Sequence, residues 1–427
     1  MTNIGQRLIG VLGLGVLVGV AWLLSRDRRR IVIRTVLWGL GLQLAFGILI
    51  LKTGPGRAVF AWLGGAFRQL IAFTDQGIAF VFGSGAEPVL LTEKIADVQY
   101  KVNLPLAFRA LPVIIFFASL MGILYHLGIM QRVVAGMAWL MRRTMKVSGA
   151  EALSGAGNIF LGMTESPLLI RPYVANLTQS ELFAVMVGGL ATIAGSVMAV
   201  YVSFGIQAEL LLCASVMSAP AALAIAKIME PETEEPATSG AVPVRFEHET
   251  RNVIDAAAGG AWDGLRLALN VAAMLIAFVA LLAMINYLLG EVSRGAAGIG
   301  WTGCPSKLED ILGWLFRPLA FVMGVPWGDA RAIGSVMGIG ISANEWIAYT
   351  QLAGMAKSGA LQPASVGIGT FALCGFANFG SLGIIIGGIG GLAPERRGDL
   401  SRLALRALIG GAIACYMTAT IAGMLLG

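Results

Sequence analysis

Two glutamates stand in otherwise apolar stretches of this chain, and they are the side chains best placed to bind a ligand. Glu165 follows 13 uncharged residues that begin after Glu151, and Glu345 follows 13 that begin after Arg331. A carboxylate inside a membrane costs at least about 2.5 kcal/mol unless it is paired or lines a wet cavity. We therefore expect both glutamates to be functional, and pairing of Glu165 with Arg171 is the alternative.

Polar neighbours accompany each glutamate. The first short apolar arm ends in MTESP (163–167), and the second ends in SANE (342–345). Carboxylates flanked by hydroxyls and amides suit an uncharged, polyhydroxylated solute, because each carboxylate can accept two hydroxyl donors. The sequence therefore predicts a solute-binding site that both arms contribute to.

Asn158 and Thr192 are candidates for holding a small cation. Asn158 lies seven residues before Glu165, and Thr192 opens the small, polar patch TIAGS (192–196) inside an apolar run. Side-chain oxygens together with backbone carbonyls freed at a helix break suit Na⁺. The alternative is that these two side chains only cap the ends of broken helices.

The elements that must position these residues are membrane helices. Of the 427 residues, 57% are hydrophobic and only 13% are charged, and the mean hydropathy is +0.80. Soluble domains have about 45–50% apolar and about 25% charged residues, so a water-soluble enzyme is excluded. The chain has no HExxH, GxSxG or GxxxxGK[ST] motif, which argues against an enzyme. Its four cysteines are far apart, so neither a metal site nor a disulfide framework is expected.

We expect eight transmembrane helices. Uncharged runs of spanning length occur at 8–25, 35–51, 110–131, 182–208, 210–226, 267–290 and 407–427, and a broken span is expected within 358–394. The net charge of +6 arises from basic residues in short loops, at 26–34, 131–146 and 395–406. This distribution indicates cytoplasmic loops and not nucleic-acid binding, and it places both termini in the periplasm. Residues 57–82 are expected to lie along the membrane interface.

The arms before Glu165 and Glu345 are too short to cross a bilayer, so we expect two re-entrant hairpins. The distances from Glu165 to Ser196 and from Glu345 to Phe376 are both 31 residues. Because the span count makes the hairpins enter from opposite sides, the fold class is an all-α polytopic membrane protein with an inverted repeat. The expected regions are two N-terminal spans (1–56), a scaffold region with interfacial helices and the third span (57–147), a first repeat (148–229), a cytoplasmic loop with a scaffold span (230–307) and a second repeat (308–427).

Around these clusters the chain resembles the concentrative nucleoside transporter family. The resemblance is carried by GNIFLGMTESPLLIRPY (157–173), LATIAGSVMAVYV (190–202), SANEWIAY (342–349), ALCGFANFGSLGIIIGGIG (372–390) and PERR (394–397), and it covers roughly residues 95–425. It implies a homotrimer of eight-span protomers in the inner membrane that imports nucleosides together with Na⁺, or with H⁺ in some members. No cofactor other than the coupling ion is implied. An H⁺-coupled nucleoside permease or a nucleobase permease is the alternative.

The resemblance also implies roles for individual residues. Those implied to face the nucleobase are Met163, Thr164, Glu165 and Val197, and those implied to hold the ribose hydroxyls are Glu345, Asn378 and Ser381, with Phe376 packing on the nucleoside. Those matching the Na⁺ site are Asn158 and Thr192 through their side chains, and Leu161 and Ile193 through their carbonyls. Met163 stands where many members have Gln, and the Gly162-Met163 pair resembles purine-preferring members. Thr192 stands where some members have Ser, a change that keeps the hydroxyl.

Overall fold

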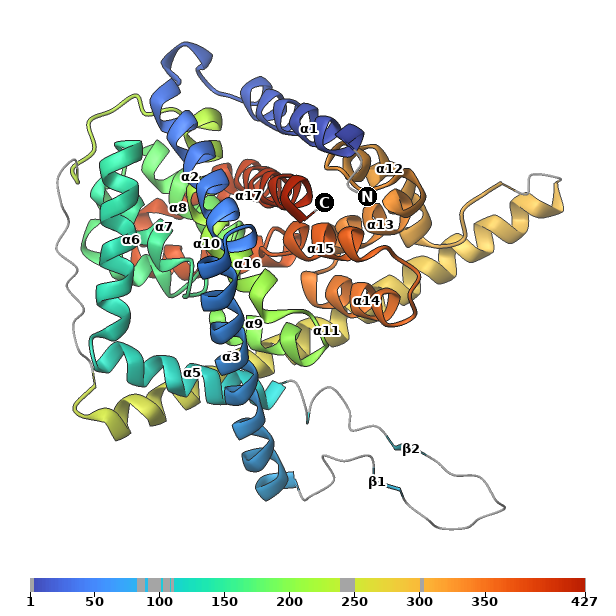
Figure 1. Cartoon of the computed structure of the whole chain (residues 1–427), viewed down its shortest axis with the longest axis horizontal. Helices are drawn as coiled ribbons and strands as arrows, with labels where there is room; N and C mark the ends of the chain where they lie inside the picture. The colour runs from blue at the N-terminus through green and yellow to red at the C-terminus, as the bar shows by residue number, and fades with distance from the viewer. Residues whose placement is uncertain are drawn as a thin grey trace.

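The computed structural model describes residues 4–82, 89–90, 101–102, 108, 111–238, 250–299 and 303–426. Within this part of the chain, helices make up the fold apart from one short strand pair (Figure 1). Strand β1 (Val89–Leu90) pairs antiparallel with β2 (Lys101–Val102), with Val89 opposite Val102. The middle of the expected cytoplasmic loop, 239–249, lies outside the described residues.

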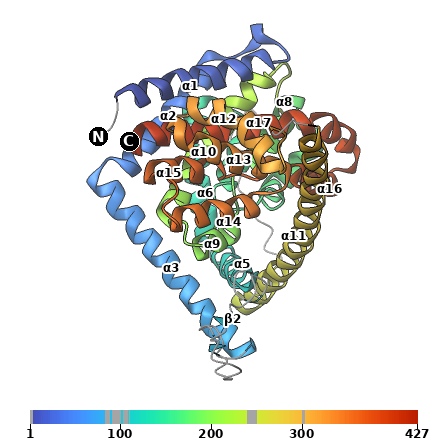
Figure 2. The same ribbon diagram turned by 90° about the vertical axis from the view of Figure 1, so that its right-hand side faces the viewer.

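A set of long helices frames the molecule. Figure 2 shows α3 and α11 flanking an inner bundle and converging near α5. Helix α11 packs on α5 but is largely exposed, since only 6% of its most apolar window is buried. The framing elements are α1 (Ile4–Leu23), the 3₁₀ turn η1 (Arg28–Arg30), α2 (Ile33–Leu51), α3 (Gly54–Phe82), α5 (Leu111–His126), α6 (Ile129–Met145) and α11 (Val253–Gly298).

The first inner unit surrounds the turn that carries Glu165. Its elements are α7 (Gly149–Gly157), the 3₁₀ helix η2 (Ser166–Asn176), α8 (Gln179–Leu190), α9 (Gly195–Ser203) and α10 (Ala208–Met229). A capping box between Ser148 and Glu151 starts α7, because the two side chains satisfy each other's orphan backbone donors. The chain between α8 and α9 is not helical, so the backbone groups of TIAGS are free for other partners.

The second inner unit repeats this plan around Glu345. Its elements are α12 (Leu308–Val322), α13 (Trp327–Ser342), α14 (Glu345–Lys357), α15 (Pro363–Ala372), α16 (Phe379–Leu392), the 3₁₀ turn η3 (Pro394–Arg396) and α17 (Arg397–Leu426). Asn344 caps α14 by accepting from the Ile347 backbone N–H, and Asn378 caps α16 by accepting from that of Ser381. Each break is therefore closed by an asparagine at the start of the following helix.

The described helices are those of a multi-pass membrane protein. Five are long and apolar enough to cross a membrane, and two further pairs qualify if each bent pair is taken as one span. The expected straight span at 110–131 is bent, because α5 ends at His126 and α6 leaves at an angle of 78°. Gly128 makes this bend with a φ of +73°, a conformation that glycine adopts without steric cost.

The basic loops gather at one end of the molecule. Arg26 and Arg406 both pair with Glu230, which joins the loop after α1, the end of α10 and the start of α17. The junction before α7 lies at the same end, where the Gly149 N–H donates to the carbonyl of Thr238 over 2.7 Å. The beginning of α1 and the end of α17 lie beside each other at the opposite end (Figure 2).

The turn between α12 and α13 lies with the termini. A Cβ placed on Gly423 of α17 would lie 3.2 Å from the carbonyl oxygen of Met323, and one placed on Gly13 of α1 would lie 2.2 Å from that of Val322. The α6–α7 junction and the α12–α13 junction thus lie at opposite ends of the molecule.

Candidate functional site

Glu345 is held by two donors from different parts of the fold. It is the first residue of α14 and only 5% exposed. The Tyr201 hydroxyl donates to its Oε1 over 3.1 Å, and the Asn378 amide Nδ2 donates to its Oε2 over 2.6 Å. The N-terminus of α14 adds a favourable dipole for the carboxylate. The carboxylate is thereby accommodated with no basic partner among the described residues.

The structure brings together the three residues that were expected to hold a ribose. Asn378 donates to Glu345, and its Oδ1 accepts from the Ser381 backbone N–H over 2.8 Å. Asn378 and Ser381 are 4% and 3% exposed. Because α14 and α16 both begin here, two helix N-termini converge on one carboxylate, and acceptor and donor groups lie within one small volume.

Sequence reasoning missed Tyr201, which lies beside this cluster. Its ring stacks on that of Tyr349 with centroids 4.3 Å apart, and it meets the edge of Trp346 at 5.7 Å. Val197 lies one turn earlier on the same face of α9, because residues four apart in a helix are neighbours. That spacing from Val197 is the signal that could have identified Tyr201.

The turn of the first hairpin lies between α8 and α16. A Cβ on Gly189 of α8 would lie 2.8 Å from the Cβ of Met163, and a Cβ on Gly388 of α16 would lie 2.7 Å from Cγ2 of Thr164. Gly388 is seven residues after Ser381, so both are on one face of α16. Met163 therefore packs against α8, and Thr164 packs against α16, the helix whose first turn carries Ser381.

Among the described residues, no hydrogen bond joins Glu165 to Glu345, Asn378 or Ser381. The Oε2 of Glu165 is buried and has no hydrogen-bond partner in the same part of the chain. The carboxylate folds over Gly162, where an added Cβ would lie 2.1 Å from Oε2. Arg171 is exposed, and within the described ranges no ion pair joins it to Glu165. The expected alternative of pairing with Arg171 is therefore wrong.

Asn158 is the least satisfied polar side chain of the first unit. It is 1% exposed, and neither Oδ1 nor Nδ2 has a partner in the part of the chain that the structure describes. Its amide lies against α8, since a Cβ on Gly188 would lie 2.9 Å from Nδ2. The Thr192 hydroxyl donates to the Gly188 carbonyl over 2.9 Å. Gly188 is therefore where the two expected cation ligands meet.

The capping alternative describes Thr192 but not Asn158. Thr192 bonds back one turn along α8, whereas the Asn158 side chain makes no cap bond. Among the described residues, the carbonyls of Leu161 and Ile193 accept no backbone hydrogen bond, and the Gly195 N–H donates to the neighbouring Phe160 carbonyl over 3.0 Å. An orphaned amide oxygen, a hydroxyl and two free carbonyls are neutral oxygen donors, which suit an alkali cation.

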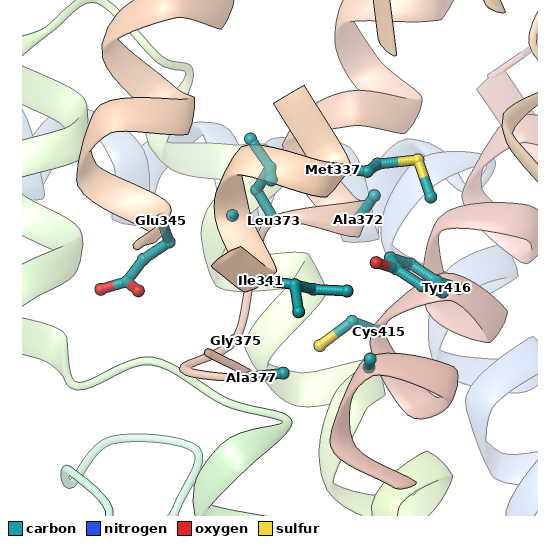
Figure 3. A pocket seen from close by; sticks show the side chains of 11 residues that line it. Met337, Ile341, Glu345, Ala372, Leu373, Gly375, Ala377, Cys415 and Tyr416 are labelled. Atoms are coloured by element: carbon teal, nitrogen blue, oxygen red, sulfur yellow. The ribbon is translucent and has the colours of Figure 1, made fainter. Parts of the chain in front are cut away.

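A small cavity lies on the far side of Glu345. It measures about 20 Å³ and is bounded by α13, the break between α15 and α16, and α17. In Figure 3 the Glu345 carboxylate points away from Cys415 and Tyr416, which lie across this cavity. That volume is enough for a single water molecule and far too small for a nucleoside. Phe376, 8% exposed, lies in the same break.

Comparison with known sequences places three family descriptions on this chain. "Na+ dependent nucleoside transporter N-terminus" matches residues 12–85, "Nucleoside recognition" matches 107–208 and "Na+ dependent nucleoside transporter C-terminus" matches 210–423. An uncharacterized transporter of Haemophilus influenzae is 44% identical over 98% of both chains. Solute carrier family 28 member 3 and sodium/nucleoside cotransporter 2, both from rat, are each 42% identical over 98% of this chain. The chain spans only 59% and 63% of these two rat proteins.

Solved structures show the same likeness. CNTnw in an inward-facing substrate-bound state is 42% identical, with a TM-score of 0.89 over 99% of this chain and 98% of that one. A doubly substituted CNTnw in an outward-facing state has a TM-score of 0.90 over 100% and 99% of the two chains, also at 42% identity. The fold and the sequence therefore agree on one family over the whole chain.

Proposed function

Because the chain belongs to the concentrative nucleoside transporter family, we propose that it imports nucleosides across the inner membrane by symport with Na⁺. The observation that carries this proposal is the buried Glu345 carboxylate, held by Asn378 where two helices begin. The family is one of transporters, and no step of catalysis is proposed for this chain.

Glu345 is suited to a ribose because it can accept from two hydroxyls. Each of its oxygens accepts one protein donor, from Tyr201 or Asn378, and a carboxylate oxygen has about two lone-pair sites. One site per oxygen is left for the sugar, and Ser381 lies beside Asn378. The nucleobase would then face the residues of the first hairpin and α9, with Phe376 packing on the nucleoside. The residues that would face the nucleobase are Met163, Thr164, Glu165 and Val197.

Na⁺ coupling is supported by the unsatisfied amide of Asn158. With the Thr192 hydroxyl and the carbonyls of Leu161 and Ile193, its Oδ1 supplies neutral oxygens beside the break in α8–α9. A proton would instead need a titratable group at this place. One observation favours the H⁺-coupled alternative, which is the buried, unpartnered Oε2 of Glu165. A nucleobase permease would leave Glu345 without a ribose.

Uptake into proteoliposomes tests the proposal. Labelled adenosine or uridine should accumulate when an inward Na⁺ gradient is imposed and should not accumulate when choline replaces Na⁺. Accumulation that follows a pH gradient and ignores this replacement would support the H⁺-coupled alternative. Accumulation of a labelled nucleobase in place of the nucleoside would support the nucleobase-permease alternative.

We also propose a graded preference for purine nucleosides. Met163 offers a flexible, polarizable thioether that packs on aromatic faces and is only a weak acceptor. Its backbone is close to Gly189 of α8, so its side chain has a firm support. A purine presents more ring surface to it than a pyrimidine does.

The membrane arrangement that we propose follows from the two ends of the molecule. The end where Arg26 and Arg406 pair with Glu230 is cytoplasmic by the distribution of basic loops, and both termini are then periplasmic. The α6–α7 and α12–α13 junctions lie at opposite ends, as expected for an inverted repeat. The five regions set out from the sequence serve as its domains. The exposed apolar length of α11 is available to lipid and to the other protomers of a homotrimer.

A further inference from the structure

The Tyr201 hydroxyl links the first inner unit to the glutamate of the second. Tyr201 belongs to α9 and is fully buried, and its hydroxyl donates to Oε1 of Glu345 over 3.1 Å across 144 residues of sequence. The other Glu345 oxygen is held by Asn378, which belongs to the same unit as Glu345. Tyr201 is therefore the donor to this carboxylate that comes from the unit containing Asn158 and Thr192.

The ring of Tyr201 is fixed on two sides. It stacks on Tyr349 at 4.3 Å and meets the edge of Trp346 at 5.7 Å. Both of these residues lie on α14, the helix that begins with Glu345. With the ring fixed, the hydroxyl has one place to donate, and little further rotamer entropy is lost when it does so.

Helix α9 connects Tyr201 directly to the proposed cation site. It has nine residues, a length of about 13 Å, and it begins at Gly195, immediately after the break that contains Thr192 and Ile193. Its first N–H, that of Gly195, donates to the Phe160 carbonyl in the turn after Asn158. A shift at the break therefore moves α9 as a short rigid rod, and Tyr201 moves with it.

We propose that Tyr201 is a positioning residue that couples occupancy of the cation site to ribose recognition by Glu345. The inference rests on the proposed function and names a residue through which its two halves communicate. A cation bound at Asn158 and Thr192 orders the break, and the ordered break fixes α9. Tyr201 then holds Oε1 while Asn378 holds Oε2, so both remaining lone pairs are aimed at the sugar. Without the hydroxyl, the carboxylate turns about its terminal torsion, which is broad and soft.

The coupling must work in both directions. If cation binding improves ribose binding through Tyr201, ribose binding improves cation binding by the same factor. A purely structural role, in which Glu345 only satisfies a buried phenol, makes a different prediction. Removing the hydroxyl would then change stability and leave both the choice among sugars and its Na⁺ dependence as they were.

The test compares Tyr201→Phe with Tyr349→Phe in proteoliposomes. Both changes keep the stacked rings and remove one buried hydroxyl, but the Tyr349 hydroxyl donates to the Thr370 carbonyl and not to Glu345. Competition by adenosine and by 2′,3′-dideoxyadenosine is measured at low and saturating Na⁺. In Tyr201→Phe we expect the preference for adenosine to fall about tenfold and its dependence on Na⁺ to weaken. In Tyr349→Phe both should match the wild type.

An unchanged preference in Tyr201→Phe, or equal losses in the two variants, overturns the inference. A double-mutant cycle adds a second readout, because Tyr201→Phe should have little further effect on sugar choice in a Glu345→Gln background. If Tyr201→Phe does not fold, the wild-type protein still tests the coupling between the cation site and ribose recognition. Na⁺ must then improve binding of adenosine more than that of the dideoxy analogue, and equal improvement overturns the coupling. Failure of the wild type to transport any nucleoside would instead reject the proposed function.

Discussion

Glu345 is a carboxylate whose two oxygens each retain capacity for one more donor. Replacing it by glutamine removes the charge and makes one terminal atom a donor. Charge-assisted hydrogen bonds contribute roughly 1.5–3 kcal/mol each, so Glu345→Gln should lose about 2 kcal/mol of ribonucleoside binding, or about thirtyfold in affinity. A dideoxynucleoside should lose much less. Competition assays with both ligands measure the difference, and Glu309→Gln, outside the site, is the control.

Asn158 should control the response to Na⁺. Its amide is buried and has no partner in the described part of the chain, so Asn158→Ala removes a proposed ligand and breaks no hydrogen bond there. We expect a higher Na⁺ concentration for half-maximal uptake and a weaker nucleoside affinity, because the two sites are linked. Asn286→Ala is the matched control, since that amide is bonded to Glu309 and to the Leu308 N–H. The control should lose stability and keep the Na⁺ response. The same Na⁺ response in Asn158→Ala and wild type would remove Asn158 from the site.

Met163 should set the preference between bases. A thioether contact with an aromatic face contributes roughly 0.3–1.5 kcal/mol, and glutamine would add a hydrogen-bonding amide. We expect adenosine to compete better than uridine by about 1 kcal/mol, a factor of several, and Met163→Gln to move the ratio toward uridine. Met355→Gln, near the other end of α14, should leave the ratio alone. Equal competition in the wild type, unchanged by the substitution, would show that Met163 does not read the base.

The polar residues of the site could be predicted because polar side chains are unusual inside apolar stretches of sequence. Glu345 and Asn378 interrupt apolar runs, and the structure joins them by a hydrogen bond. Tyr201 could not be found in this way, because an aromatic residue in an apolar helix is the ordinary filling of a core. Its partner Glu345 is 144 residues away, so the only sequence signal for Tyr201 is its four-residue spacing from Val197. The orphaned state of Asn158 is likewise a property of packing.

Among the helices, breaks are foreseen more easily than bends. TIAGS (192–196) and GFANFG (375–380) gather small and polar residues, and the helices stop there. The bend between α5 and α6 was missed because hydropathy continues through Gly128, and only its positive φ turns the chain. Helix α11 also extends well beyond the expected span at 267–290, to Val253–Gly298. An apolar run indicates which residues a bilayer can accommodate. The ends of the helix are set by capping residues outside that run, such as Asn252 at the start of α11.

Helix α8 approaches the proposed cation site so closely that a side chain at position 188 would displace the Asn158 amide. A Cβ there would lie 2.9 Å from Nδ2 of Asn158, so Gly188→Ala should push the amide aside and weaken the Na⁺ response. Alanine favours a helix by about 1 kcal/mol over glycine, so the helix itself should not be lost. Gly354→Ala on α14, where a Cβ meets nothing within 4 Å, is the control. Parallel Na⁺ titrations of uptake should separate the two, and identical titrations would contradict this placement of Asn158.

At the scale of the whole molecule, charged groups hold the basic end together. Arg26, Glu230 and Arg406 join the loop after α1, the end of α10 and the start of α17. More deeply, Lys227 of α10 pairs with Glu151 of α7 and with Glu232 of the following loop, and it donates to the Ser180 hydroxyl of α8 over 2.8 Å. The start of the first hairpin is thereby tied to α8 and α10, so these elements should move as one body during transport.

Loss of Lys227 should destabilise the whole fold. The side chains of Lys227 and Glu151 are only 9% and 1% exposed, and breaking a buried pair by removing one partner typically costs 3–5 kcal/mol, because it leaves an uncompensated charge. Lys227→Met should therefore lower the thermal unfolding temperature of the purified transporter markedly. Adding Glu151→Gln should recover part of the loss, since the stranded charge is then removed.

An exposed pair on α11 provides the comparison for Lys227. Arg294 and Glu291 pair with side chains that are 71% and 43% exposed, and such surface pairs contribute about 0–1 kcal/mol. Arg294→Met should accordingly leave the unfolding temperature nearly unchanged. If Lys227→Met melts no lower than Arg294→Met, the buried cluster does not hold the basic end together. Sugar and base preferences should survive in whatever Lys227→Met protein remains folded, because the cluster lies at the end of the molecule and not at Glu345.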